Sequence, residues 1–210
     1  MIKVIPFIYV DLDDLYANTY VLIDEKNECV VVDPAKPDQG IVKYIQKNDL
    51  TLKGILLTHG HIDHIRGVDA IFHVFHCPVY IGFEDQDKLN DEFSNCSMLF
   101  GDSFIISAPS ITVADKEALK LLEEDIHVVE TPYHTSGSVC YYLKESQLLF
   151  TGDFLFKGGI GRCDLPTAMP KEFDNSLRKI LALPKETKVY PGHGKSTTLE
   201  EECRANPFVK

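Results

Sequence analysis

The segment GILLTHGHIDHIRG at residues 54–67 constrains the fold more than any other stretch of the chain. Its apolar run, residues 55–57, predicts a buried strand. Metal-capable side chains follow directly: His59, His61, Asp63 and His64. If the extended backbone continues, His59 and His61 point to one side and suit a single ion, whereas Asp63 and His64 suit a neighbouring ion. Asp63 could instead only cap a helix, but three clustered imidazoles make a poor core, so we favour a metal site.

Three later segments have the same order of features: an apolar strand, turn residues, and one metal-capable side chain. They place His134 in VVETPYHTSGS, Asp153 in LLFTGDFLF and His193 in KVYPGHG. Ligands at strand ends can converge at one edge of a sheet. The seven donors are too many for one four-coordinate ion and suit two ions with a bridging carboxylate and an open position, which a catalytic site keeps. The remaining histidines lack this order and are predicted to be structural or surface residues: His73, His76 and His127.

Short segments rich in β-branched and aromatic residues, bounded by Gly, Pro, Asn or Asp, predict strands. They are residues 2–9, 19–24, 29–33, 54–57, 79–81, 126–130, 138–143, 148–151 and 188–190. Helical periodicity predicts helices over residues 37–47, 68–75, 170–182 and 199–205. Residues 116–125 fit either a helix or a strand. Strands that alternate with helices, together with hairpins, predict a mixed α/β sandwich.

The composition sets the broad class. A chain of 210 residues without a Gly/Pro/Ser-rich linker predicts one domain, residues 1–210. A net charge of −11 argues against a nucleic-acid partner. We expect a cytoplasmic protein without a membrane partner, because the chain has no long apolar run, no signal-peptide cleavage site and dispersed cysteines without a C-x-x-C pair. Nothing in the sequence predicts the oligomeric state.

Four blocks together carry a family resemblance: THGHIDH, TPYHTSGSVCYYL, TGDFLFKGGIGRCDL and YPGHG. In this order they resemble the metallo-β-lactamase superfamily and, within it, the short glyoxalase II-like (hydroxyacylglutathione hydrolase-like) hydrolases. The resemblance covers essentially the whole chain and implies a four-layer αβ/βα sandwich with metals at one edge between two mixed sheets. For residues 116–125 it implies a hairpin leading into the His134 strand.

The resemblance also implies a role for each donor. One ion would be held by His59, His61 and His134, a second by Asp63, His64 and His193, and Asp153 would bridge them. Zinc is the default metal, with iron or manganese as alternatives. The implied activity is that of a binuclear metallo-hydrolase, a thioesterase for small S-acylated thiols of the S-lactoylglutathione type. In this hypothesis a metal-bound hydroxide attacks the thioester carbonyl, and Asp63 is a ligand rather than a separate base.

Three departures from the family pattern bear on the substrate. Tyr133 stands where the family usually has Gly, so it is strained if φ is positive, or it faces the substrate. The chain stops soon after His193, without the C-terminal helical extension that helps hold glutathione in full-length glyoxalase II enzymes, so the thiol carrier stays open. Arg162 is a planar donor for a substrate carboxylate, and Lys157 is a further candidate substrate contact.

Other members of the superfamily suggest alternatives. A mononuclear-iron persulfide dioxygenase would use His59, His134 and Asp153 alone, and the complete second ligand set disfavours it. The GGIGRCDL block points away from a β-lactamase or lactonase. A non-catalytic metal-binding module is disfavoured by the complete ligand set.

Overall fold

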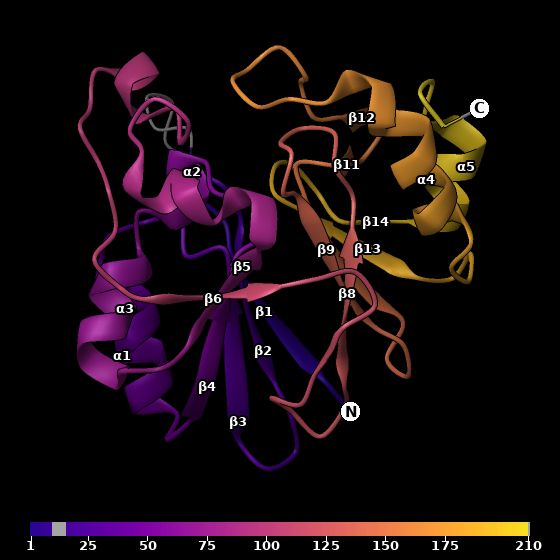
Figure 1. Cartoon of the computed structure of the whole chain (residues 1–210). Helices are drawn as coiled ribbons and strands as arrows, with labels where there is room; N and C mark the ends of the chain where they lie inside the picture. The colour runs from indigo at the N-terminus through magenta and orange to yellow at the C-terminus, as the bar shows by residue number, and fades with distance from the viewer. Residues whose placement is uncertain (10–15, 210) are drawn as a thin grey trace.

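The computed structural model describes residues 1–9 and 16–209, and its centre is a pair of six-stranded sheets lying face to face (Figure 1). The first sheet has the order β1-β2-β3-β4-β5-β6. Its strands are β1 (Lys3–Phe7), β2 (Thr19–Ile23), β3 (Glu28–Val32), β4 (Thr51–Leu56), β5 (Val79–Gly82) and β6 (Ser110–Val113). The β1-β2-β3 part is antiparallel and the β3-β4-β5-β6 part is parallel, so the sheet is mixed.

The second sheet has the order β14-β13-β10-β9-β8-β7. Its strands are β7 (Ala118–Leu119), β8 (Ile126–Glu130), β9 (Val139–Leu143), β10 (Leu148–Gly152), β13 (Lys188–Pro191) and β14 (Thr197–Thr198). Only the β10–β13 pair in it is parallel. A separate small hairpin, β11 (Leu155–Phe156) with β12 (Gly159–Ile160), stands beyond the end of β10.

Helices cover the outer face of each sheet, which completes the four expected layers (Figure 1). Helices α1 (Gly40–Lys47) and α3 (Val68–Phe75) lie on the first sheet, and α4 (Phe173–Leu181) and α5 (Leu199–Ala205) lie on the second. The short α2 (Ile62–Ile65) sits at the sheet edge. Short 3-10 helices complete the set: η1 (Phe83–Asn90), η2 (Ser97–Phe100) and η3 (Pro170–Glu172).

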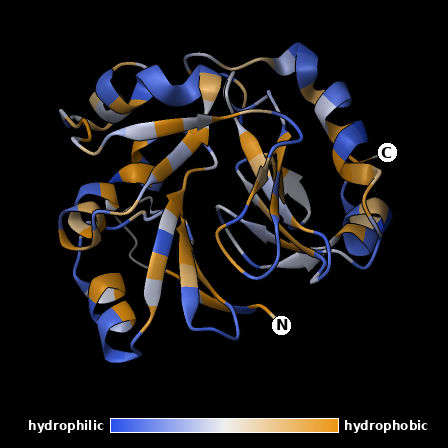
Figure 2. Ribbon diagram, turned by 60° about the horizontal axis from the view of Figure 1, so that its bottom comes forward, coloured by the Kyte–Doolittle hydropathy of each residue, from blue (hydrophilic) through white to orange (hydrophobic). Residues whose placement is uncertain are grey.

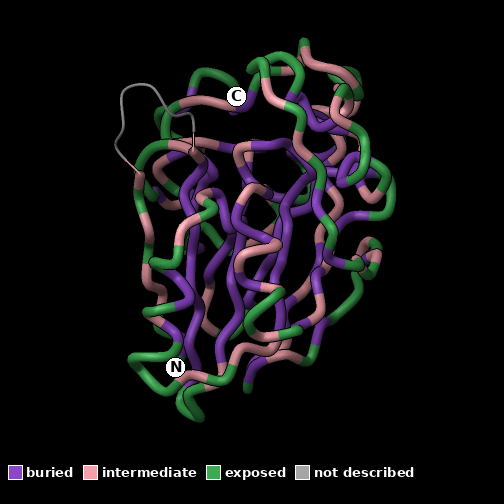
Figure 3. The backbone as a smooth tube through the Cα atoms, turned by 90° about the vertical axis from the view of Figure 1, so that its left-hand side faces the viewer, coloured by how far each residue is buried: buried purple, intermediate pink, exposed green. Residues whose placement is uncertain are grey.

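The central strands are buried and largely apolar on both faces, because each sheet is covered on both sides (Figures 2 and 3). In β2, Leu22 joins the core between the sheets, while its neighbour Val21 joins the core under α1 and α3. In β9, Tyr141 faces the inter-sheet core and Tyr142 packs toward α4 and α5. This alternation fixes the register of each strand, and with it the point at which each strand ends.

The expected αβ/βα sandwich is therefore confirmed, with differences in detail. Residues 116–125 contain β7, which pairs antiparallel with β8, so the hairpin is correct and the helix is wrong. The strand β6 and the turns η1 and η2 were not predicted, because their sequences have little periodicity. Within the described ranges, none of the helices has the length and apolarity needed to cross a bilayer.

Candidate metal centre

The segment after β4 is fixed to the second sheet before the donors begin. The Val139 amide donates to the Thr58 carbonyl (2.8 Å), and the Tyr141 hydroxyl donates to the Leu57 carbonyl (2.9 Å). His61 then precedes α2, and Asp63 and His64 lie within it. The chain leaves the strand, presents two imidazoles and turns into a helix, all at the boundary between the two sheets.

The structure brings all seven predicted donors together at this edge. His59, His61 and His134 form one group of three whose candidate ligand atoms lie within 4.8 Å of one another, and Asp63, His64 and His193 form another. Asp153, at the end of β10, lies between them: its carboxylate is 3.2 Å from His64 Nε2, 3.6 Å from His134 Nε2 and 3.6 Å from His193 Nε2. A third group, His59, His64 and Asp153, connects the other two.

Several buried polar atoms here lack a hydrogen-bond partner, which tests whether a metal fits. They are His59 Nε2, His61 Nε2, His64 Nε2 and Asp153 Oδ1. His61 Nδ1 and His134 Nε2 also face each other across 2.9 Å. An unpartnered buried polar atom is destabilising, and such a concentration of lone pairs is what a divalent cation satisfies. The donor set therefore fits divalent metal ions.

Other groups orient these imidazoles, and sequence reasoning missed them. Asp33, at the end of β3, accepts from His64 Nδ1 (2.9 Å) and from the Thr58 hydroxyl (2.7 Å) and amide (2.8 Å). The Thr58 hydroxyl lies 3.2 Å from His59 Nδ1, and His134 Nδ1 donates to the Arg162 carbonyl (2.6 Å). A proton held on Nδ1 leaves Nε2 free to bind a metal. The available signal was VVVDPA, an apolar strand ending in a carboxylate.

Asp85 is a second missed residue, and it joins the two halves of the centre. Its fully buried carboxylate accepts from the Gly60 amide (2.8 Å), the Gly137 amide (2.8 Å) and the Thr135 hydroxyl (2.8 Å). Lys88 Nζ lies 2.6 Å away and is itself only 3% exposed. Asp85 thus fastens the His59–His61 loop to the loop that carries His134. Nothing in FEDQDKLN distinguishes this acid from its neighbours.

The electrostatics separate the donors into two kinds. Burial, reinforced by the other imidazoles, holds the pKa of His59 well below its usual value and lowers the pKa of His61 to about 4. For His64, burial is outweighed by Asp63, Asp33 and Asp153, which together hold its pKa well above the usual value. For Asp153, burial is outweighed by His64 and His193, which lower its pKa. His59, His61 and Asp153 are therefore in the neutral-imidazole and ionised-carboxylate forms that bind metals, whereas His64 must release a proton to bind one.

Gly192 lets the chain pass close to the centre. A Cβ at this position would lie 2.4 Å from Asp153 Oδ1 and 2.7 Å from His64 Cε1. Such contacts are far below van der Waals separation, so either donor would have to move. The glycine before His193 is therefore required by space at the centre.

A cleft of about 340 Å³ opens onto the donors. Apolar side chains of Cys96, Phe100, Phe156 and Leu165 line it together with Arg162. Arg162 is exposed and makes a bidentate contact with Asp164 (2.6 and 2.8 Å). Of the three predicted substrate contacts, only Arg162 lies at this cleft.

The structure does not bring Tyr133 or Lys157 to the cleft. Tyr133 is 5% exposed, donates its hydroxyl to the Gly161 carbonyl (3.0 Å) and packs on Phe154 and Phe173. It does not have a positive φ, so the backbone accepts it without strain. Lys157 is exposed beside Glu201 (3.3 Å) and lines a different pocket. The other three histidines lie elsewhere: His73 on α3, His76 directly after it, and His127 in β8.

Comparison with known proteins agrees with this geometry. A model of the Metallo-beta-lactamase superfamily matches residues 12–193. The "Probable metallo-hydrolase YqgX" of Bacillus subtilis is 37% identical, over 93% of this chain and 93% of that protein. "Hydroxyacylglutathione hydrolase GloC" of Haemophilus influenzae is 32% identical, over 91% of this chain and 92% of that protein.

Two solved structures are similar over nearly their full length. The crystal structure of BLEG-1 B3 metallo-beta-lactamase is 36% identical, with a TM-score of 0.90 and coverage of 100% of this chain and 99% of that chain. The structure of TTHA1623 in a di-iron-bound form is 33% identical, with a TM-score of 0.83 and coverage of 96% and 100%.

Proposed function

The chain belongs to the metallo-beta-lactamase superfamily, and within that superfamily of metallo-hydrolases we propose that it is a binuclear thioesterase for small S-acylated thiols. The observation that carries the proposal is the set of seven converging donors, with unpartnered atoms of His59, His64 and Asp153 at the centre. The 32% sequence identity to a hydroxyacylglutathione hydrolase supports a thioester as the substrate.

The donors would hold two divalent ions: His59, His61 and His134 the first, Asp63, His64 and His193 the second, and Asp153 both. When bound, such ions polarise a carbonyl and lower the pKa of water, which is the chemistry that hydrolysis needs. Zinc is our default assignment. Iron is also compatible with these ligands, and the similar protein TTHA1623 has a di-iron-bound form, which supports iron as the alternative metal.

The side chains of this protein prepare the cleft for the reaction. Asp33, Thr58 and the Arg162 carbonyl each engage the Nδ1 of one imidazole, so three imidazoles stay oriented while substrate enters. Phe100, Phe156 and Leu165 give an apolar wall that excludes bulk water from the acyl group. The Arg162 guanidinium at the cleft suits a carboxylate on the substrate, since its present partner, Asp164, is itself exposed.

A panel of substrates on protein of defined metal content tests the proposal. Each chain should bind two metal ions and hydrolyse S-lactoylglutathione or a coenzyme A or bacillithiol thioester, with release of the free thiol. Asp153→Asn should weaken metal binding and turnover, while His73→Ala, on the outer helix α3, should change neither. Two bound metals with no turnover of any thioester would refute the thioesterase.

Hydrolysis of β-lactams is a second candidate, which the similarity to BLEG-1 favours. A β-lactam presents a carbonyl to the same centre, so the panel includes a penicillin and a cephalosporin. If the β-lactams are hydrolysed and none of the thioesters is, the protein is a β-lactamase. Oxygen uptake with glutathione persulfide, at one iron per chain, would instead support a dioxygenase, and inertness toward every substrate would support a non-catalytic metal-binding module.

A further inference from the structure

A second pocket, of about 440 Å³, lies beside the metal cleft along the open seam between the two sheets. Apolar side chains of β1 and its extension form one wall, and β13 with the loop after His193 forms the other. It is lined by Val4, Pro6, Ile8, Tyr20, Lys157, Lys188, Tyr190, Gly194, Lys195 and Ser196. We call it the lysine pocket.

Two chain segments join the lysine pocket to the metal cleft. Phe156 and His193 line the cleft, while the residues that directly follow them, Lys157 and Gly194, line the lysine pocket. The ring of Phe156 stands edge-on to that of His193, with 5.9 Å between their centroids. A single ligand can therefore reach both spaces by passing over this ridge.

The charge of the lysine pocket is opposite to that of the whole chain. Three lysines line it, and none of the described residues that line it is acidic. The whole chain, in contrast, has a net charge of −11. Lys188 lies over the Tyr190 ring at 4.8 Å, and Lys157 has one exposed partner, Glu201. Lys195 makes no ion pair with any described residue. Such a lining attracts an anion that also carries an apolar or aromatic body.

The backbone of the lysine pocket is held firmly. The Asn18 side chain, 5% exposed, donates to the Pro191 carbonyl (3.0 Å) and the Gly194 carbonyl (2.9 Å). The Tyr20 hydroxyl donates to the same Pro191 carbonyl (2.7 Å). These contacts fix the β13–β14 loop against the first sheet, so Lys188 and Lys195 project from a rigid base, which favours binding.

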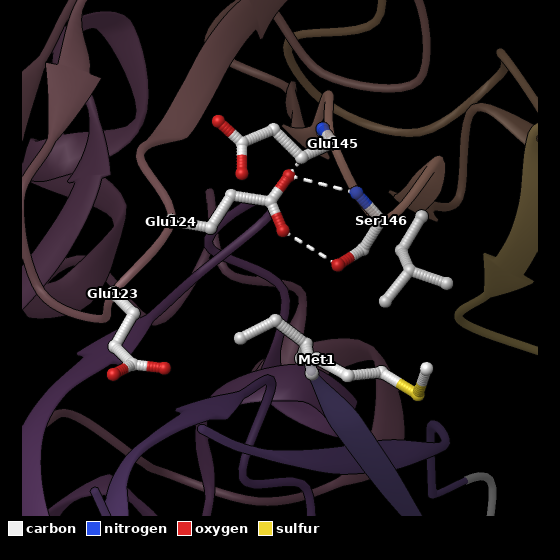
Figure 4. Close-up of a pocket in the computed structure, with 7 residues that line it drawn as sticks. Met1, Glu123, Glu124, Glu145 and Ser146 are labelled. Carbon is white, nitrogen blue, oxygen red and sulfur yellow. Dashed lines mark hydrogen bonds between the residues drawn. The ribbon is translucent and has the colours of Figure 1, made fainter. Parts of the chain in front are cut away.

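Another large pocket, of about 580 Å³, has the opposite character (Figure 4). It lies at the end of the sandwich that carries the N-terminus and is lined by Glu123, Glu124 and Glu145. The Glu124 carboxylate accepts from the amide of Ser146 (2.9 Å) and from its hydroxyl (2.5 Å). The three carboxylates there would repel an anion, so this pocket does not compete with the lysine pocket for one.

We propose that the lysine pocket binds the phosphate-bearing tail of the substrate's thiol carrier, while the thioester at the other end of the carrier lies in the metal cleft. The inference rests on the proposed thioesterase. It names a carrier of the coenzyme A class, in which an extended thiol arm joins the thioester to a nucleotide tail with several negative charges. Glutathione carries an ammonium group and fewer negative charges, and it fits three lysines less well.

Direct binding tests the pocket without any turnover. Calorimetry with adenosine 3′,5′-bisphosphate, which has the tail but no thiol, should give binding that weakens as salt increases. Lys188→Glu/Lys195→Glu should weaken it about tenfold, because each exposed charge contributes a few-fold and reversal counts twice. The matched control Lys43→Glu/Lys47→Glu, on α1 over the far face of the first sheet, should stay within about twofold of the unmodified protein on the same argument.

Kinetics then separate this inference from the proposed function. For a coenzyme A thioester, KM should rise about tenfold in the lysine-pocket variant with kcat unchanged, while the same acyl group on N-acetylcysteamine should be unaffected. If KM for the coenzyme A thioester is unchanged in the Lys188→Glu/Lys195→Glu variant, the inference is wrong and the proposed thioesterase is unaffected. Lysine-dependent binding of the bisphosphate without turnover of any thioester would overturn the thioesterase and leave the lysine pocket as an anion site alone. No bisphosphate binding, or equal affinity for inorganic phosphate, would also overturn it.

Discussion

Replacing Asp33 with Asn should weaken metal binding although Asp33 is not itself a predicted ligand. Its carboxylate is 2% exposed and accepts three hydrogen bonds, from the Thr58 amide, the Thr58 hydroxyl and His64 Nδ1. An amide has one oxygen, so its NH₂ group must face at least one of these donors. The loss of a charge-assisted hydrogen bond costs about 1.5–3 kcal/mol.

The effect should fall mainly on the ion that His64 would hold. Without the Asp33 carboxylate, the His64 proton is free to move to Nε2, the atom that a metal needs. Loss of such an orienting group typically reduces metal affinity about 10- to 100-fold. Titration against a competing chelator should therefore show one weakened equivalent, with the other less affected. The exposed Asp49→Asn is the matched control and should titrate like the unmodified protein. Two equivalents of unchanged affinity in Asp33→Asn would refute the assignment of Asp33 as a positioning residue.

Three further predictions follow from the same geometry. Removing metal with a chelator should lower the free energy of unfolding by about 3 kcal/mol for each bound ion, relative to protein with free metal at roughly 100 times its Kd. Calorimetry should show that Tm is restored when metal is added back, and an unchanged Tm would contradict the two-ion centre. Asp85→Ala should lower the free energy of unfolding, measured in urea, by about 3–5 kcal/mol, because it leaves Lys88 buried and unpaired. A decrease below about 1 kcal/mol would mean that this pair contributes no more than a surface ion pair. Gly192→Ala should abolish tight metal binding, since its Cβ would lie 2.4 Å from Asp153 Oδ1, whereas Gly159→Ala, with no atom within 4 Å, should bind metal normally; equal metal contents would show that the chain relaxes around the methyl group.

The sequence pointed to the donors because most of them stand at or soon after the end of a recognisable strand. The apolar runs before His59, Asp153 and His193 predicted β4, β10 and β13, and parallel or adjacent strand ends share an edge. The central strands were also predicted closely, since their residues are apolar on both faces. The edge strands β7 and β14 are two residues long, too short for any period to appear.

The supporting residues could not be predicted in the same way. Asp85 contacts Gly60 and Gly137, which lie 25 and 52 positions away along the chain, and no local pattern records such partners. Tyr133 shows the opposite error. Its place beside His134 suggested a substrate contact, but the ring turns into the core under α4 and the hydroxyl finds a backbone carbonyl. Proximity to a donor in sequence therefore says little about which way a side chain points.

The position of the centre between two sheets links metal binding to the packing of the fold. Four donors follow strands of the first sheet: His59, His61, Asp63 and His64, with the supporting Asp33 beside them. The other three, His134, Asp153 and His193, follow strands of the second sheet. Each proposed ion therefore takes ligands from both sheets and can bind tightly only when the sheets are docked. Because the inter-sheet core brings the same strands together through Leu56, Tyr141 and Phe150, apolar packing preorganises the donors, and the metals in turn stabilise that packing.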